Sequence, residues 1–338
     1  MVVGMISCNS NQQLTWREWG NRAVQLQKAG NVDSAASWAR AAFALYEKAE
    51  SEPDTTHVAA LERIADCLWR SRDYDSYFRV MWQCVECLEK GFGPNDLRVL
   101  RALCLLGGAY RRVTRFVEAV SALHQVRDSL EYSTEPDSSL LVEVLMDLAH
   151  SCREVGTYAE AESSLTRVFS ILEKKSNPDV NDLWNFFHES AALRLEQGLY
   201  FAAESLLTRS LEFCDDSSKC EPGVLATNLN DLGLTYHKMG RYVEAESLYV
   251  KAMKLWEKAK NSAGIASAVN NLGSFYYKEG RYEEALQCHE RALQFRREFL
   301  DPSHTEIAGS LDHLGVLYCD YGASSTEKRL SMRHSKFE

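Results

Sequence analysis

The stretch Leu232-Gly-Leu-Thr-Tyr-His-Lys-Met-Gly-Arg-Tyr-Val-Glu-Ala245 decides the architecture, because it recurs 40 residues later as Leu272-Gly-Ser-Phe-Tyr-Tyr-Lys-Glu-Gly-Arg-Tyr-Glu-Glu-Ala285. Weaker copies precede it at Leu106–Ala119, Leu148–Ala161 and Ser190–Ala203. The residue that corresponds to Gly240, here called the turn position, recurs at steps of 40 or 42 residues, at Gly30, Arg72, Thr114, Gly156, Gly198, Gly240, Gly280 and Gly322. Self-similarity at a fixed period indicates a stack of like supersecondary units.

Three columns of residues show what each unit is. The position seven residues before the turn is always small: Ala23, Ala65, Gly107, Ala149, Ala191, Gly233, Gly273 and Gly315. The position two residues after it is bulky: Val32, Tyr74, Phe116, Tyr158, Tyr200, Tyr242 and Tyr282. The position five residues after it is mostly alanine: Ala35, Tyr77, Ala119, Ala161, Ala203, Ala245 and Ala285. Small residues let two helix axes approach to 8–10 Å. Each unit is therefore predicted to be helix A, a tight turn and helix B.

The breaker residues place the boundaries between units. All six prolines, Pro53, Pro94, Pro136, Pro178, Pro222 and Pro302, fall between one helix B and the next helix A. Proline is tolerated in the first turn of a helix and disrupts its interior. The pattern predicts an all-α chain with an N-terminal extension over 1–14 and an array over 15–322 of seven helix pairs plus one final helix. Residues 323–338 form a basic tail without a bulky plug, which we expect to be disordered or truncated.

These columns resemble the tetratricopeptide repeat family, whose Leu-Gly-x-x-Tyr, Gly-x-Tyr and alanine positions they reproduce. The 42-residue period and the loop Asp301-Pro-Ser-His-Thr-Glu-Ile-Ala308 are similar to the long repeats of kinesin light chains and nephrocystin-type proteins. The resemblance implies a right-handed superhelical solenoid whose A helices line a concave groove. It also implies a protein–protein interaction scaffold rather than an enzyme.

Composition and motifs agree with that class. The net charge of −10 disfavours a nucleic-acid partner, because phosphate binding depends on clustered cations. No apolar run approaches the roughly 18 residues of a membrane span. Scattered cysteines favour a reducing, cytoplasmic setting. No nucleophile motif or phosphate loop is present. Cys84-Val-Glu-Cys87 has no second cysteine pair, so we expect core packing there, no bound metal and no cofactor.

Two sets of A-helix residues are candidates for partner binding. Cations near the ends of the A helices could receive an acidic peptide through charge-assisted hydrogen bonds, although helix C-termini favour cations in any case. This set is Lys28, Arg70, Arg111, Arg112, Arg153, Lys238 and Lys278. Asparagine is a poor mid-helix residue whose amide can pair with the main chain of an extended peptide. This second set is Asn228, Asn230, Asn270 and Asn271, and in kinesin-light-chain-like repeats the similar stretch Val269-Asn-Asn-Leu272 tends to face the groove.

The two sets coincide in the sixth and seventh repeats, where His237 would add a stacking surface. The sequence thus predicts that this face binds an extended, acidic segment of a protein partner. It also predicts that Asn230→Ala with Asn270→Ala weakens binding and leaves stability unchanged or slightly higher. Two alternatives stay open: a structural or self-associating solenoid, and the regulatory or sensor fragment of a larger protein. The oligomeric state is open as well.

Overall fold

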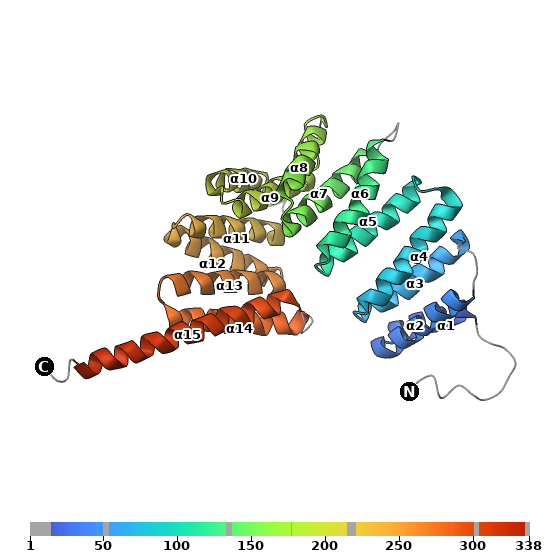
Figure 1. Ribbon diagram of the computed structural model, residues 1–338. Helices are drawn as coiled ribbons and strands as arrows, with labels where there is room; N and C mark the ends of the chain where they lie inside the picture. Colours follow the sequence, from blue (N-terminus) through green and yellow to red (C-terminus); the bar gives the residue numbers. More distant parts are fainter. Residues whose placement is uncertain are drawn as a thin grey trace. The chain divides into compact units, whose positions relative to one another are not determined.

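The computed structural model describes residues 15–49, 54–132, 137–176, 178–214, 221–300 and 304–334, and all regular secondary structure in these ranges is α-helix (Figure 1). The chain divides into two compact units, 1–157 and 158–338. The N-terminal unit holds α1 (Trp16–Lys28), α2 (Val32–Lys48), α3 (Thr55–Arg70), α4 (Tyr74–Phe92), α5 (Leu97–Arg112), α6 (Phe116–Glu131) and α7 (Ser138–Val155). The C-terminal unit holds α8 (Tyr158–Leu172), α9 (Val180–Glu196), α10 (Tyr200–Cys214), α11 (Pro222–Lys238), α12 (Tyr242–Lys258), α13 (Ser262–Lys278), α14 (Tyr282–Phe299) and α15 (Thr305–His334).

Consecutive helices pack as the predicted A–B pairs inside each unit: α1 with α2, α3 with α4 and α5 with α6, then α9 with α10, α11 with α12 and α13 with α14. Within a unit, A helices also pack against helices of the preceding pair, as α13 does against α11 and α12. The prediction of an all-α repeat array of helix pairs is confirmed.

From Gly30 to Gly280 the turn position has a left-handed backbone whether or not it is glycine, whereas Gly322 lies inside α15. Gly156, Gly240 and Gly280 have φ of 86°, 79° and 71°. Arg72 and Thr114 hold the same conformation at φ 61° and 60°, where a Cβ atom is crowded by the backbone. The tight turn is thus set by the packing of the two helices, and the non-glycine residues accept the strain.

The small columns bring helix A against helix B. A Cβ atom on Gly107 would lie 2.7 Å from Leu123 of α6, closer than real Cβ contacts. The alanines five residues after the turn are fully buried in every repeat that has one among the described residues: Ala35, Ala119, Ala161, Ala203, Ala245 and Ala285. Tyr77, the exception, lies against the rings of Trp69 and Phe78, at centroid distances of 4.9 and 5.2 Å.

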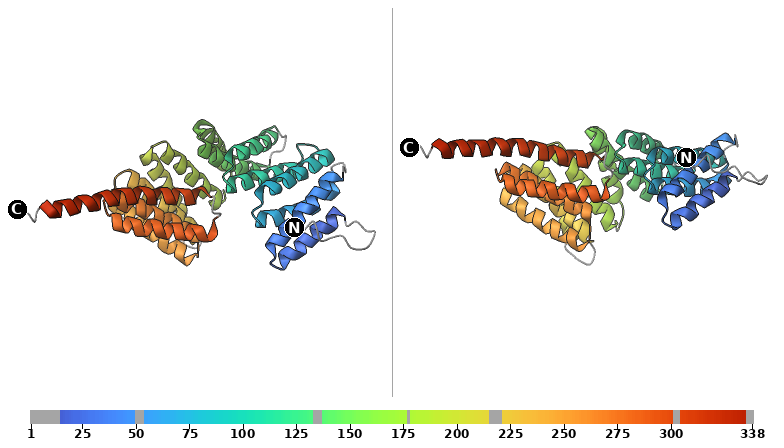
Figure 2. Two further views of the ribbon diagram at one scale, coloured as in Figure 1. Left: turned by 60° about the horizontal axis from the view of Figure 1, so that its bottom comes forward. Right: turned by 90° about the horizontal axis from the view of Figure 1, so that it is seen from below.

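The two ends of the chain differ from each other. The predicted extension over 1–14 lies outside the described residues, and α1 begins after Thr15, whose side chain caps it. At the other end, α15 runs through Gly322 to His334, so the backbone over 323–334 is helical. The physical reason is local: the segment contains no proline and is rich in helix formers such as Lys328, Arg329, Leu330 and Met332. Figures 1 and 2 show the end of α15 extending beyond α13 and α14.

Candidate functional site

The A helices of the C-terminal unit are joined by a row of polar side chains, here called the polar row: His188, Asn230, Asp231, Asn270, Asn271 and His313. Each contact between two A helices joins equivalent pairs of positions. The first residue lies ten positions before the turn position of its repeat, and the second lies nine positions before the turn position of the next repeat. Thus His188 Nε2 of α9 lies 2.7 Å from Asp231 Oδ2 of α11. The Asn271 amide of α13 donates to Asn230 Oδ1 of α11 at 3.0 Å. The row follows from the stacking, because equivalent positions of neighbouring A helices lie side by side.

The predicted asparagines therefore have partners within the chain. Asn230 is 7% exposed, and its amide donates to Asp231 Oδ1 at 3.0 Å while accepting from Asn271. Asn270 Oδ1 lies 3.3 Å from His289 Nδ1 of α14 and 3.2 Å from His313 Nδ1 of α15. These bonds give mid-helix asparagines a structural reason, and they reverse the expected effect of Asn230→Ala on stability.

Asn228 has a different place from the other asparagines. Its side chain is fully buried, and its amide donates to Ser210 Oγ of α10 at 2.8 Å. Its oxygen has no partner among the described residues. The prediction that Asn228 faces a ligand is wrong, because a residue two positions from Asn230 lies about 200° around the helix and here faces the neighbouring helix B.

His237 is a buried imidazole with an unused nitrogen. The residue is 8% exposed, and Nε2 finds no hydrogen-bond partner in the part of the chain that is described. The rings of Tyr242 and Phe275 lie at centroid distances of 5.7 and 6.2 Å. Burial lowers the pKa of His237, and the charges of Lys278 and Lys238 lower it further. His237 is therefore neutral near pH 7, with one ring nitrogen that can donate and one that can accept.

The two lysines beside His237 are exposed cations. Lys238 ends α11 and Lys278 ends α13, and neither makes an ion pair with the described residues. Lys238 directly follows His237 on α11, and the charges of both lysines lower the pKa of His237. We call His237, Lys238 and Lys278 the cationic site. It combines a desolvated imidazole with two positive charges, a combination that suits a carboxylate.

The predicted arginines of the N-terminal unit are differently placed. Arg70 pairs with Asp66 at 3.2 Å, and Arg111 pairs with Asp147 at 2.9 Å. Arg153 pairs with Glu154 at 2.9 Å. Only Arg112 of this group is exposed without an ion pair to a described residue. The expected row of like charges is thus largely neutralised here, by acidic residues that the repeat columns do not reveal.

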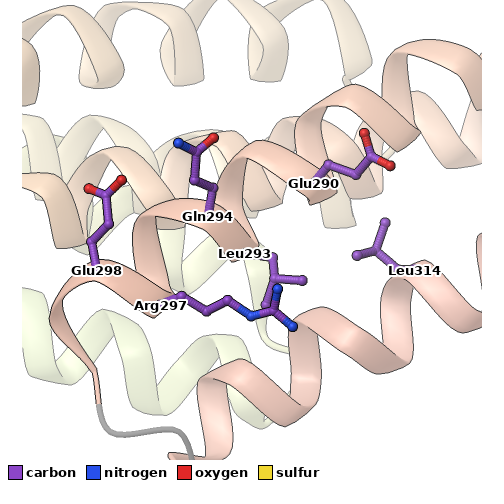
Figure 3. A pocket seen from close by; sticks show the side chains of 6 residues that line it. All are labelled: Glu290, Leu293, Gln294, Arg297, Glu298 and Leu314. Atoms are coloured by element: carbon purple, nitrogen blue, oxygen red, sulfur yellow. The ribbon is translucent and has the colours of Figure 1, made fainter.

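Two surface cavities have defined linings, and neither includes a predicted site residue. One of about 470 Å³ lies between α14 and α15, lined by Glu290, Leu293, Gln294, Arg297, Glu298 and Leu314 (Figure 3). The other, of about 400 Å³, is lined by one face of α10: Phe201, Glu204, Ser205, Thr208, Arg209 and Glu212. Sequence reasoning missed both, although the missing helix B after Gly322 was a signal for the first.

The cysteine pair lies in the core. Cys84 and Cys87 are 1% and 0% exposed, and the Cys87 thiol lies 3.6 Å from the Tyr46 hydroxyl. Burial strongly raises the pKa of the Cys84 thiol, so it stays protonated and is a poor ligand. Among the side chains the structure describes, no three His, Cys, Asp or Glu residues gather as a metal site would need. No described helix is both long and apolar enough to cross a membrane.

Comparison with known proteins identifies the repeats. Residues 179–258 and 264–325 match the tetratricopeptide repeat family. A tetratricopeptide repeat protein from Parabacteroides merdae superposes with a TM-score of 0.60, 14% identity and coverage of 88% of this chain and 98% of its own. A Rap protein complexed with competence and sporulation factor gives a TM-score of 0.60, 16% identity and coverage of 91% and 87%.

Repeats described as those of a kinesin light chain are also among the similar solved structures. TPR-like repeats of a Podosopora anserina protein described as a kinesin light chain are 20% identical, cover 60% of this chain and 97% of their own, and have a TM-score of 0.48. No curated protein sequence matches the chain. At these identities the structural matches show the fold alone, and the family match carries the assignment of the repeats.

Proposed function

We propose that this chain is a non-catalytic adaptor, because residues 179–258 and 264–325 match the tetratricopeptide repeat family, whose fold is that of a protein-interaction scaffold. Its ligand is an extended, acidic segment of a protein partner, bound on the A-helix face of α11 and α13. The free thiols of the described cysteines suit a reducing compartment, and the cytoplasm is part of the same proposal.

The observation that carries the proposal is the cationic site. A buried polar atom without a partner costs about 1–3 kcal/mol, which a ligand recovers by pairing with it. His237 Nε2 is such an atom, and Lys238 and Lys278 add charge next to it. A carboxylate oxygen can accept from the imidazole N–H and from both ammonium groups at once. A carboxylate bound there would form a hydrogen bond with His237 Nε2, which has no other described partner. It would also neutralise the charges of Lys238 and Lys278, which make no ion pair with a described residue.

The polar row adds a surface for the peptide main chain. Asn230 and Asn271 form one hydrogen bond with each other, and the side-chain amide of each residue can take part in up to four hydrogen bonds. Asn271 is only half buried, so part of its capacity faces the solvent. The Rap protein complex supports ligand binding by this fold in general. The proposed ligand orientation thus has carboxylates at the cationic site and main chain along the polar row.

Fluorescence anisotropy tests the proposal with a labelled Glu-rich peptide and its Gln-for-Glu counterpart. Only the acidic peptide should bind, and Lys238→Gln with Lys278→Gln should weaken it about tenfold, because exposed charge contacts are worth up to about 1 kcal/mol each. Lys254→Gln with Lys258→Gln is the matched control, since it removes the same charge from exposed positions on α12. Equal losses in both double variants would mean that net charge alone, and not the cationic site, attracts the peptide.

A further inference from the structure

The pair of positions held by His237 and Lys278 in the cationic site recurs between α13 and α15 with the opposite charge. His237 lies three positions before the turn position of its repeat, and Lys278 lies two positions before the next turn position. Tyr277 and Asp320 hold the same two positions one repeat later. The Tyr277 hydroxyl donates a hydrogen bond to Asp320 Oδ2, from α13 to α15. A carboxylate thus stands where the preceding repeat has a lysine.

A chain of three tyrosine rings lies beside this carboxylate. The rings of Tyr277 and Tyr282 have their centroids 5.8 Å apart, and those of Tyr282 and Tyr321 lie at 6.5 Å. Tyr282 holds the position that Tyr242 holds in the preceding repeat, two residues after the turn. The face of a tyrosine ring attracts a cation that lies within about 6 Å of its centroid. We call Tyr277, Tyr282 and Asp320 the anionic site.

The carboxylates at this end of the unit are held by tyrosine hydroxyls and by no cation of the described residues. Asp320 Oδ2 accepts from Tyr277, and its second oxygen accepts from no described residue. Beside it, Glu283 Oε1 accepts from the Tyr321 hydroxyl at 3.1 Å. The hydrogen bond to Asp320 raises the pKa of Tyr277, so the phenol stays protonated and keeps donating near pH 7. The negative charge of the anionic site is therefore available to a cation of a ligand.

The charge on the A helices changes sign from α11 to α15. Helix α11 ends in His237 and Lys238, and α13 ends in Lys278 with Glu279 as its C-cap residue. Negative charge at a helix C-terminus opposes the helix dipole, so the stability of α13 does not explain Glu279. At the position equivalent to Lys278, α15 carries Asp320. Because α11 packs against α13 and α13 against α15, a segment lying across these helices meets positive charge first and negative charge last (Figure 1).

The spacing of packed helices suits an extended ligand with a charge at every third residue. The axes of packed helices lie about 8–10 Å apart. A polyproline II segment has three residues per turn and advances about 3.1 Å per residue, so residues i and i+3 lie on the same side, about 9 Å apart. Every third residue of such a ligand therefore meets the equivalent position of the next A helix.

We propose that the ligand reverses its charge along its length: two acidic residues three positions apart lie at Lys238 and Lys278, and a basic residue three positions further pairs with Asp320. This inference rests on the proposed function, because it specifies the acidic segment that the cationic site binds. A guanidinium group can donate to the second oxygen of Asp320 and lie over the Tyr277 ring. The ligand is then Glu-x-x-Glu-x-x-Arg or, in the opposite chain direction, Arg-x-x-Glu-x-x-Glu.

Fluorescence anisotropy on the full chain tests the inference with labelled peptides of both orders, each made with Arg and with Gln in its place. In one order the Arg version should bind about fivefold more tightly, because an exposed ion pair and a cation–π contact each add modestly to affinity. Asp320→Asn should remove this difference and leave the affinity of the Gln version unchanged, since asparagine keeps an oxygen that accepts from Tyr277. Asp320→Lys should instead favour a peptide with Glu in place of Arg.

Glu298→Gln is the matched control, because it removes the same charge from an exposed position on α14 and should leave the difference between the Arg and Gln versions intact. Equal affinity of the two versions for the wild type in both orders, or a difference that survives Asp320→Asn, would overturn the inference. The proposed function would then still stand, since it requires only that Glu peptides bind better than their Gln-for-Glu counterparts. If no acidic peptide binds at all, the proposed function fails, and the inference fails with it.

Discussion

Replacing Asn230 with alanine tests whether the polar row stabilises the array. Two terms oppose each other at this position. Alanine is the better helix former by about 0.5 kcal/mol. The substitution removes the bond from Asn271 at 3.0 Å and the bond to Asp231 at 3.0 Å, each worth about 0.5–1.5 kcal/mol. Because Asn230 is 7% exposed, water replaces these bonds poorly. We expect the variant to lose about 0.5–2 kcal/mol of unfolding free energy.

A double-mutant cycle isolates the contact between the two amides. Asn230→Ala, Asn271→Ala and the double variant should show a coupling of about 0.5–1.5 kcal/mol in urea unfolding followed by circular dichroism. Asn185→Ala is the matched control, because Asn185 is an exposed asparagine inside α9 and should gain about 0.5 kcal/mol from helix propensity. Repeat arrays can unfold in more than two states, so hydrogen exchange in α11 and α13 provides a local measure.

One result would refute this reasoning. If Asn230→Ala stabilises the protein as much as Asn185→Ala does, and the coupling with Asn271 is zero within error, the inter-repeat bonds contribute nothing. The asparagines would then have no structural role, and ligand contact would be the better reason for their presence in the helix.

Two further predictions concern the packing of α13, α14 and α15. Gly273→Ala should lower the unfolding free energy by about 1–3 kcal/mol, because its Cβ atom would lie 2.9 Å from the buried His289 ring. Gly315→Ala should raise it by up to about 1 kcal/mol, because nothing lies within 4 Å of a Cβ atom there, and equal effects in thermal melts would contradict this difference in packing. Burial and the neighbours His313 and Arg296 lower the pKa of His289 to about 4, so the unfolded chain binds the proton more tightly than the folded chain does. The contribution of His289 to the unfolding free energy should therefore be full above pH 6.5 and fall as the pH drops toward 4. His289→Gln should flatten this dependence of the unfolding free energy on pH, and an unchanged dependence would show that other groups cause it.

The sequence determined the repeat and most of the helix boundaries. The small columns, the bulky plug and the prolines are local requirements of a helix pair, and each acts through residues close together in the chain. The turn position could be read even at Arg72 and Thr114, where glycine is missing, because the spacing of the flanking columns is unchanged. Core packing of Cys84 and Cys87 was expected because no second cysteine pair follows them, and both are buried.

Only the tertiary structure decided which side chains are free to bind. Asn230 and Asn271 are 41 residues apart and meet only when neighbouring A helices stack, so their bond has no local signature. The same holds for Arg111 and Asp147, whose pairing neutralises a predicted site cation. Only the folded array shows that His237 Nε2 is buried without a hydrogen-bond partner among the described residues, and that nothing lies within 4 Å of a Cβ atom on Gly315. A repeat pattern fixes what each helix contacts within its own unit, whereas the partners of polar side chains depend on the distances between units that only the folded array sets.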